Sequence, residues 1–441
     1  MKEELDNHKF GLTYHEILYL IILLVITLFL HILFYLQAIW PGDIDLFRFV
    51  ERSTYVLEGK IPYSDKELLT DPKPFWTLFL AFWLFFCRTA IQILFKVEDS
   101  ASYDLDFTKI LLISINLIMI VTLFFASKHM LSPKSAYLTS GFYAINLFPL
   151  IICSVVGKYD VIPALFTLIA VWMVTKAKFR LSALFLAIGT LFKYLVILPL
   201  PILLIFLWKR ERDQKLLTNY LTTYLVTCFI VLSPFLFINA QKFLSATVYY
   251  FLIRESHGYK SYYHPFHYIP SQFHILFPLI SLSLICIYTL KQDSISNSDL
   301  IMLLFMEYAT FTFTNKVFLS QYFLYAIPFL ALVFPSMLLN ENKFNFSFTS
   351  ISLAISTIII PNFLSHSFLK FFISVQNASF NDFKLSELLN ISTSFSYIGD
   401  TDGRVFLICF TLILCISFYY VLKKQNNLRF TNLHKNPYDS S

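Results

Sequence analysis

Charged residues are scarce in this sequence. Asp, Glu, Lys and Arg together make up 14% of the 441 residues, whereas soluble globular domains carry roughly 25%. Apolar runs of about 20 residues, the length that crosses a bilayer as a helix, recur along the whole chain. The composition therefore excludes a soluble globular protein and predicts an all-α polytopic membrane protein.

Cysteine pairs in loops, a signal-peptide cleavage site and internal repeats are also missing. The six cysteines all lie inside apolar segments, so we expect no disulfide framework and no redox chemistry. Since no small-residue cleavage site follows the first apolar run, 17–39, we interpret this run as a retained span. The net charge is +6. In a membrane protein, excess Lys and Arg mark the cytoplasmic loops, so this charge does not indicate a nucleic acid partner, and we expect none.

The apolar segments and their basic flanks predict how the chain crosses the membrane. Lys and Arg favour cytoplasmic loops, so the basic connections at 128–134, 176–180 and 209–215 and the tail from Lys423 should be cytoplasmic. The segments expected to lie in the membrane are 17–39, 108–126, 136–155, 161–175, 181–208, 216–238, 272–290, 299–314, 321–338, 347–363 and 404–422.

This orientation has two consequences. The apolar piece 75–95 cannot cross in addition to 108–126, so it should lie in the outer interface or re-enter. Segment 181–208 has basic flanks at both ends, which predicts a hairpin of two short broken helices with its tip near Lys193 and Tyr194. The result is a bundle of about 12 membrane segments with both termini inside.

The predicted topology divides the chain into two parts. Residues 1–338 form a membrane module whose first outer loop, 40–107, is long and carries amphipathic or re-entrant helices. Residues 339–441 hold C-terminal membrane segments, an outer loop at 364–403 and a cytoplasmic tail.

Two carboxylates stand one residue apart just after the first span, Asp43 and Asp45. A carboxylate at this place can act as a general base, or bind a hard divalent ion that also contacts phosphate oxygens. The alternative is that one of them caps an amphipathic helix that runs through Leu46 and Phe49. The two roles can coexist.

Lysines occur at outer positions that the positive-inside rule disfavours. Lys158 and Asp160 lie in a tight turn between two spans, and Asp160 could instead cap the next helix. Lys193 lies in the middle of an apolar segment, where snorkelling to the surface is hardest. A lysine at the tip of a broken helix can bind phosphate as a point charge.

Two further outer segments hold candidate residues. Lys316, Gln321 and Tyr322 occupy a short loop and the top of the next span, which could also be an ordinary loop with an interfacial aromatic residue. Arg254 and Glu255 begin a segment that contains three histidines, but their spacing fits no closed metal site. The alternative for that segment is an aromatic and polar interfacial loop.

The order of these elements resembles the GT-C class of membrane glycosyltransferases. In particular it resembles the polyprenyl-phosphate-mannose-dependent mannosyltransferases, notably the GPI mannosyltransferase I catalytic subunit and its prokaryotic relatives. The sequences "GDIDLFRFV" and "NKVFLSQYFLY" carry most of the resemblance, as the family's D-x-D and its signature between late spans. It extends over about residues 17–338. One departure is "LLTDPKPFW", where such enzymes often carry a Tyr-Pro-Pro or Tyr-Thr-Pro element.

The resemblance implies transfer of a sugar, expected to be mannose, from a polyprenyl- or dolichyl-phosphate donor to a lipid or glycolipid acceptor, by inverting single displacement. The catalytic candidates are Asp43 and Asp45, with Asp160 as a second carboxylate. The donor-phosphate candidates are Lys193, Lys158, Lys316 and Arg254. The sugar and acceptor candidates are Tyr63, Tyr194, Gln321, Tyr322 and Glu255.

The resemblance also bears on cofactors and setting. A divalent cation, Mg²⁺ or Mn²⁺, would bind Asp45 and Asp160, but the lysines could replace it. The expected membrane is a prokaryotic plasma membrane or the endoplasmic reticulum, with the site on the outer or lumenal face. A small accessory membrane subunit is compatible with this class.

Two alternative functions fit the sequence less well. A lipid-linked-sugar flippase or secondary transporter would be expected to show a repeat and charges on both access routes, whereas these charges collect at one face. An enzyme similar to the oligosaccharyltransferases would require a large soluble outer domain, which the sequence lacks.

Overall fold

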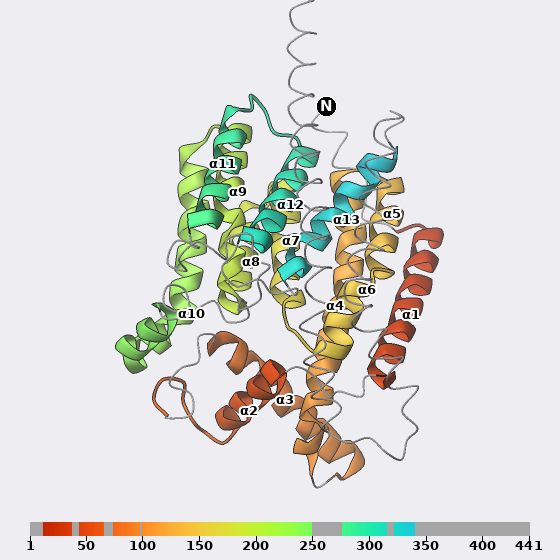
Figure 1. Cartoon of the computed structure of the whole chain (residues 1–441), viewed down its shortest axis with the longest axis vertical. Coiled ribbons are helices and arrows are strands. Elements are labelled where there is room, and N and C mark those ends of the chain that lie inside the picture. Colours follow the sequence, from red (N-terminus) through yellow and green to blue (C-terminus); the bar gives the residue numbers. More distant parts are fainter. Residues whose placement is uncertain are drawn as a thin grey trace, which may run out of the picture. The chain divides into compact units, whose positions relative to one another are not determined.

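The computed structural model describes residues 12–37, 44–65, 74–97, 99–248, 276–314 and 322–339. All regular elements of this part of the chain are helical (Figure 1). The α-helices are α1 (Tyr14–Gln37), α2 (Ile44–Leu57), α3 (Pro74–Phe95), α4 (Asp104–Met130), α5 (Pro133–Ala144), α6 (Leu147–Ile151), α7 (Val161–Thr175), α8 (Phe179–Phe192), α9 (Pro199–Glu211), α10 (Gln214–Val248), α11 (Leu276–Lys291), α12 (Asn297–Thr314) and α13 (Phe323–Leu339). The short elements are the 3₁₀ helices η2 (Ser100–Tyr103) and η4 (Tyr194–Ile197) and the π-helix η3 (Ile152–Val156).

Membrane-spanning capacity follows from length and composition. Within the described residues, 4 helices are long and apolar enough to cross a membrane: α1, α3, α4 with η2 before it, and α10. Helix α5 together with α6 and η3 would be a fifth if this bent pair counts as one span. The figure of about 12 segments stays a prediction, and the predicted segments 347–363 and 404–422 lie outside the described residues.

Outward apolar side chains mark the surfaces that face lipid. On α1 the exposed side chains include Ile22, Val25 and Phe29, and on α10 they include Phe229 and Ile230. Contiguous exposed apolar surface of this kind is costly in water. These two helices therefore place their outer faces in the hydrocarbon.

The basic connections gather at one end of the bundle, which we call the basic end. Lys128 at the end of α4 pairs with Glu16 at the start of α1, at 2.6 Å. Lys209 near the end of α9 donates to the carbonyl of Leu290 in α11, at 2.7 Å, and the Arg210 guanidinium lies 3.4 Å from the carbonyl of Thr175 at the end of α7. This geometry agrees with the prediction that these connections share one side of the membrane.

The predicted hairpin is present. Helix α8 ends at Phe192, Lys193 is extended (φ −155°, ψ 120°), and α9 starts at Pro199 and returns to the basic end. Each arm is about 20 Å long, shorter than a full span. Proline has no N–H, and the first turn of a helix is the helical position that tolerates it best, so Pro199 favours a new helix at this point.

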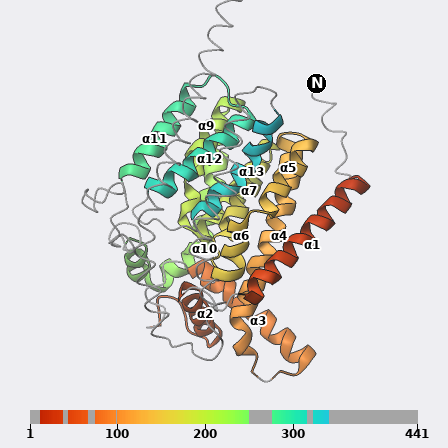
Figure 2. The ribbon, with the colours of Figure 1, turned by 45° about the vertical axis from the view of Figure 1, so that its right-hand side comes forward.

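Helix α3 begins and ends at the opposite end of the bundle, which we call the site end. Near its start, the Trp76 ring stacks on Tyr159 with centroids 4.5 Å apart. Further along, Arg88 forms an ion pair with Asp104, the first residue of α4. Figure 2 shows α3 beside α2 at this end. This placement supports the prediction that 75–95 does not cross, although its length and composition would permit it.

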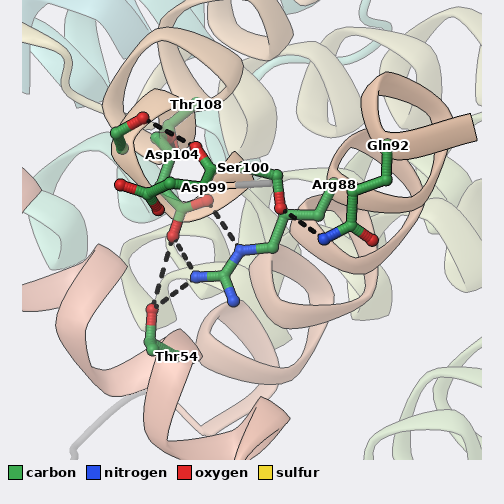
Figure 3. Close-up of polar contacts among 8 residues, drawn as sticks. Thr54, Arg88, Gln92, Asp99, Ser100, Asp104 and Thr108 are labelled. Carbon is green, nitrogen blue, oxygen red and sulfur yellow. Dashed lines mark hydrogen bonds and ion pairs between the residues drawn. The ribbon is translucent and has the colours of Figure 1, made fainter. Parts of the chain in front are cut away.

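A polar cluster ties α2, α3 and α4 together (Figure 3). The Arg88 guanidinium donates to both carboxylate oxygens of Asp104, and its Nη2 also donates to Thr54 Oγ1 of α2, at 3.2 Å. Gln92, one turn further along α3, donates to Ser100 Oγ of η2 at 2.9 Å. Arg88 has the planar fork that a carboxylate can bind with two oxygens, and it fixes α2 against the start of α4.

One predicted span contains a break, and a kink directly follows the end of another. Segment 136–155 is not one helix, because the chain bends by 46° between α5 and α6. Asn146 causes the break: its side chain accepts a hydrogen bond from the N–H of Phe148 and so caps a new helix. Helix α10 extends to Val248, but a kink at Asn239 (φ −160°, ψ 86°) interrupts it one residue after the predicted end of segment 216–238.

Candidate functional site

Asp45 lies in the first turn of the amphipathic helix α2. The apolar residues Leu46 and Phe49 and the small Ser53 share one face of this helix and are buried, as the helical repeat dictates. A carboxylate in the first turn is favoured by the helix dipole. Asp43, the other candidate base, lies outside the described residues.

The turn that carries Lys158 and Asp160 follows the π-helix η3. Gly157 closes η3 in the left-handed region (φ 74°, ψ 38°), and the N–H groups of Gly157 and Lys158 both donate to the carbonyl of Ile152, at 2.9 and 3.1 Å. A Cβ atom on Gly157 would lie 2.5 Å from Cδ2 of Leu46. Glycine is therefore required both by the backbone and by the close approach of α2.

Lys158 and Asp45 form the first ion pair of the site. Lys158 Nζ lies 2.6 Å from Asp45 Oδ2, although the two residues are 113 positions apart. The Lys158 side chain is 5% exposed, whereas the Asp45 side chain is 43% exposed. The ammonium is thus held inside the protein, and the carboxylate can still be reached from solvent.

Lys193 and Asp160 form the second pair, which is buried on both sides, with exposures of 7% and 1%. Lys193 Nζ also lies 4.5 Å from the ring centroid of Tyr322 and 5.8 Å from those of Tyr159 and Tyr325. Aromatic faces stabilise a cation at such distances. The second oxygen of Asp160, Oδ2, is buried and has no hydrogen-bond partner among the described residues.

These contacts decide between alternatives that the sequence left open. Asp160 precedes α7, but its side chain forms no cap hydrogen bond and pairs with Lys193 instead. Lys193 does not snorkel, since it is buried at the tip of the hairpin. Both lysines face carboxylates at the site end of the bundle.

Comparison with known families bears directly on this arrangement. Residues 100–271 match the family model of glycosyltransferase family 87. This is a GT-C-type family of membrane glycosyltransferases. No curated protein matches the chain. The match includes Lys158, Asp160 and Lys193, whereas Asp45 and Tyr322 lie outside it.

Over residues 100–271 the family 87 match agrees with the predicted resemblance to the GT-C class, but the two motifs that carry most of that resemblance lie outside the matched residues. The match does not specify mannose as the sugar. The roles assigned to individual residues also stay predictions.

The structure brings together only some of the predicted site residues. Tyr322 contacts Lys193, and Tyr194 begins η4 directly after it and is half-buried. Tyr63 is buried in the left-handed region (φ 65°) and packs against Phe235 and Phe243 of α10, with centroids 6.0 and 5.4 Å away. The other candidates, Arg254, Glu255, Lys316 and Gln321, lie outside the described residues.

Two aromatic residues of the site were missed from the sequence. Trp76 stacks on Tyr159 and is fully buried. Tyr325 is one of the three tyrosines whose aromatic rings lie within 6 Å of the Lys193 ammonium. A signal for Tyr325 was present, because residues three apart on a helix share a face and Tyr322 was already a candidate. No such signal pointed to Trp76.

The site carboxylates Asp45 and Asp160 are the residues predicted to hold a divalent cation. Within the described ranges, no group of three or more His, Cys, Asp or Glu side chains could bind a metal ion. Asp45 and Asp160 each face a lysine of their own. The lysines supply positive charge at both carboxylates, and a cation held by Asp45 and Asp160 stays a prediction.

Gly157→Ala is expected to lower the free energy of unfolding by more than the backbone strain at residue 157 alone would. The left-handed conformation costs a residue with a Cβ about 1–2 kcal/mol, and the new methyl would also collide with Leu46. We expect a lower thermal unfolding midpoint in detergent and weaker sugar transfer.

Gly59 offers a matched control, because it has φ +87° and, its chain neighbours apart, no atom of the described residues lies within 4 Å of the place that an added Cβ would take. Gly59→Ala should show the strain without the collision. Equal midpoints for the two variants would mean that Leu46 does not press on Gly157.

Proposed function

We propose that this protein transfers a sugar, mannose in the first instance, from a polyprenyl-phosphate donor to a lipid or glycolipid acceptor. One observation carries the proposal: two lysine–carboxylate pairs lie at one end of a bundle whose outer faces are apolar. The family 87 match over residues 100–271 supports the reaction class. The choice of mannose rests on the resemblance of "GDIDLFRFV" and "NKVFLSQYFLY".

The first pair suggests how the base becomes available. While Lys158 binds Asp45, the carboxylate is a weak proton acceptor, because the nearby ammonium stabilises its charged form. The donor's phosphate is an anion that competes for the same ammonium. In this scheme, donor binding draws Lys158 toward the phosphate and leaves Asp45 able to accept a proton from the acceptor hydroxyl.

The displacement then proceeds in a single step. The acceptor oxygen attacks the anomeric carbon as Asp45 takes its proton, and the bond from that carbon to the phosphate oxygen breaks with inversion. Polyprenyl phosphate leaves with the bonding electrons, and its charge is balanced by Lys158, with Lys193 nearby, so no separate acid is required. Asp43 stays an alternative base, and Asp160 holds Lys193 in place.

The remaining assignments follow the same scheme. Tyr322 and Tyr194 would contact the sugar near Lys193. The predicted roles of Lys316 and Arg254 with phosphate, and of Gln321, Glu255 and Tyr63 with sugar or acceptor, also remain proposals. We propose the outer or lumenal face of a prokaryotic plasma membrane or the endoplasmic reticulum, because the basic end should be cytoplasmic.

The proposal is tested with the protein reconstituted in lipid nanodiscs. Polyprenyl phosphate carrying radiolabelled mannose is supplied with a membrane lipid extract as acceptor, and parallel reactions contain the glucose-linked donor or a chelator. We expect label to move from the donor into a new glycolipid with the mannose donor. Transfer only from glucose would correct the sugar, and loss with chelator would add a metal. No transfer from either donor, but movement of intact donor across vesicles, would favour the flippase.

A further inference from the structure

A buried chain of hydrogen bonds joins side chains from four elements of the bundle. The Tyr143 hydroxyl donates to Oδ1 of Asn116 at 2.9 Å, and Nδ2 of Asn116 lies 2.9 Å from Nε2 of His31. The other ring nitrogen of His31, Nδ1, is hydrogen-bonded to Oγ of Ser154. All four side chains are buried, and they come from α5, α4, α1 and η3.

The network fixes the tautomer of His31. Because Tyr143 donates to the amide oxygen of Asn116, the amide nitrogen faces the histidine and donates to Nε2. Nε2 then accepts, so the ring proton is on Nδ1 and is donated to Ser154. Each contact therefore has a defined donor and acceptor.

The hydrogen-bond network ends at Ser154, which lies in a π-helix. Ser154 is in the middle of the π-helix η3, and Gly157, Lys158 and Asp160 follow directly. π-Helices are rare, and they often occur at functional sites. The register of η3 determines where both site residues of the turn point.

We propose that His31 is a positioning residue for the candidate site. Its Nδ1–H bond to Ser154 keeps η3 in the π register, and η3 in turn holds Lys158 against Asp45 and Asp160 against Lys193. Only the catalytic consequence rests on the proposed function. The structural consequence, a fixed turn at 157–160, is independent of it.

Two substitutions of His31 separate its two hydrogen bonds. An asparagine amide can place an N–H near the position of Nδ1, so His31→Asn should retain the bond to Ser154. A glutamine amide reaches the position of Nε2, so His31→Gln should retain the bond to Asn116 and lose the bond to Ser154. Ser154→Ala removes the Ser154 contact from the other side.

The experiment measures amide hydrogen exchange of a peptide covering 157–160, and the kcat and KM of sugar transfer, for all three variants in nanodiscs. We expect exchange on the order of tenfold faster in His31→Gln and Ser154→Ala, with His31→Asn close to the unsubstituted protein. In His31→Gln and Ser154→Ala, kcat should also fall by about tenfold or more, because a small displacement of the reacting groups slows the reaction strongly.

Equal exchange and equal kcat in His31→Asn and His31→Gln would overturn the proposal, since His31 would then only join helices. If the protein transfers no sugar at all, the exchange measurement still decides on its own. Unchanged exchange in Ser154→Ala would likewise overturn the proposal.

Discussion

Asp45→Asn is expected to reduce sugar transfer by about 10²–10⁴-fold, the contribution of a positioned general base. The asparagine amide has nearly the shape of the carboxylate but cannot accept the proton of the attacking hydroxyl. The amide oxygen of the asparagine can still accept the hydrogen bond from the buried Lys158 ammonium. The variant should therefore fold. Initial rates with radiolabelled donor in nanodiscs, together with the thermal unfolding midpoint, measure both effects.

Lys158→Met is the matched control for this variant. It removes the other partner of the same pair, and Asp45 keeps its access to solvent. In the proposed scheme Lys158 binds the donor's phosphate, so KM for the donor should rise while Asp45 remains an effective base. Full activity of Asp45→Asn would mean that Asp45 serves only as a first-turn carboxylate and partner of Lys158. The base would then have to be Asp43 or Asp160.

The sequence predicted which groups share an end of the bundle, because charge bias orients helices. The basic flanks of 181–208 forced a hairpin, and this hairpin carries Lys193 to the level of Asp160. The same reasoning placed Asp45 and Lys158 on one side. These predictions needed only the rule for cytoplasmic lysine and arginine and the length of each apolar run.

The pairing of these groups could not be predicted, because it depends on how helices rotate and approach one another. Lys158 meets Asp45 where Leu46 packs over Gly157, a contact that only the absence of a Cβ allows. His31 gave no signal at all, since a single histidine in an apolar run has no periodicity and its partners come from other elements. The helix break at Asn146 was missed because this N-cap residue stands inside a long apolar run that was interpreted as one continuous span.

Lys193→Met should be the most destabilising of the substitutions at the ion pairs. Asp160 is 1% exposed, and removing one partner of a buried pair typically costs about 3–5 kcal/mol, because a charge is left without compensation. Lys158→Met should cost about 1 kcal/mol or less, since Asp45 remains in contact with solvent. Thermal unfolding in one detergent compares the two variants directly.

The double variant Lys193→Met with Asp160→Leu separates the stability of the pair from its role in the reaction. Replacing a buried pair by apolar side chains of similar volume is often neutral or stabilising, so the double variant should recover most of the unfolding midpoint lost by Lys193→Met. Sugar transfer should not recover, because the hairpin tip then lacks the Lys193 ammonium near the donor's phosphate. Recovery of both would reduce the pair to a packing element, and the reaction would depend on Asp45 and Lys158 alone. If instead Lys193→Met is as stable as Lys158→Met, water reaches Asp160, and the interior of the site is open to solvent at the level where the sugar must bind.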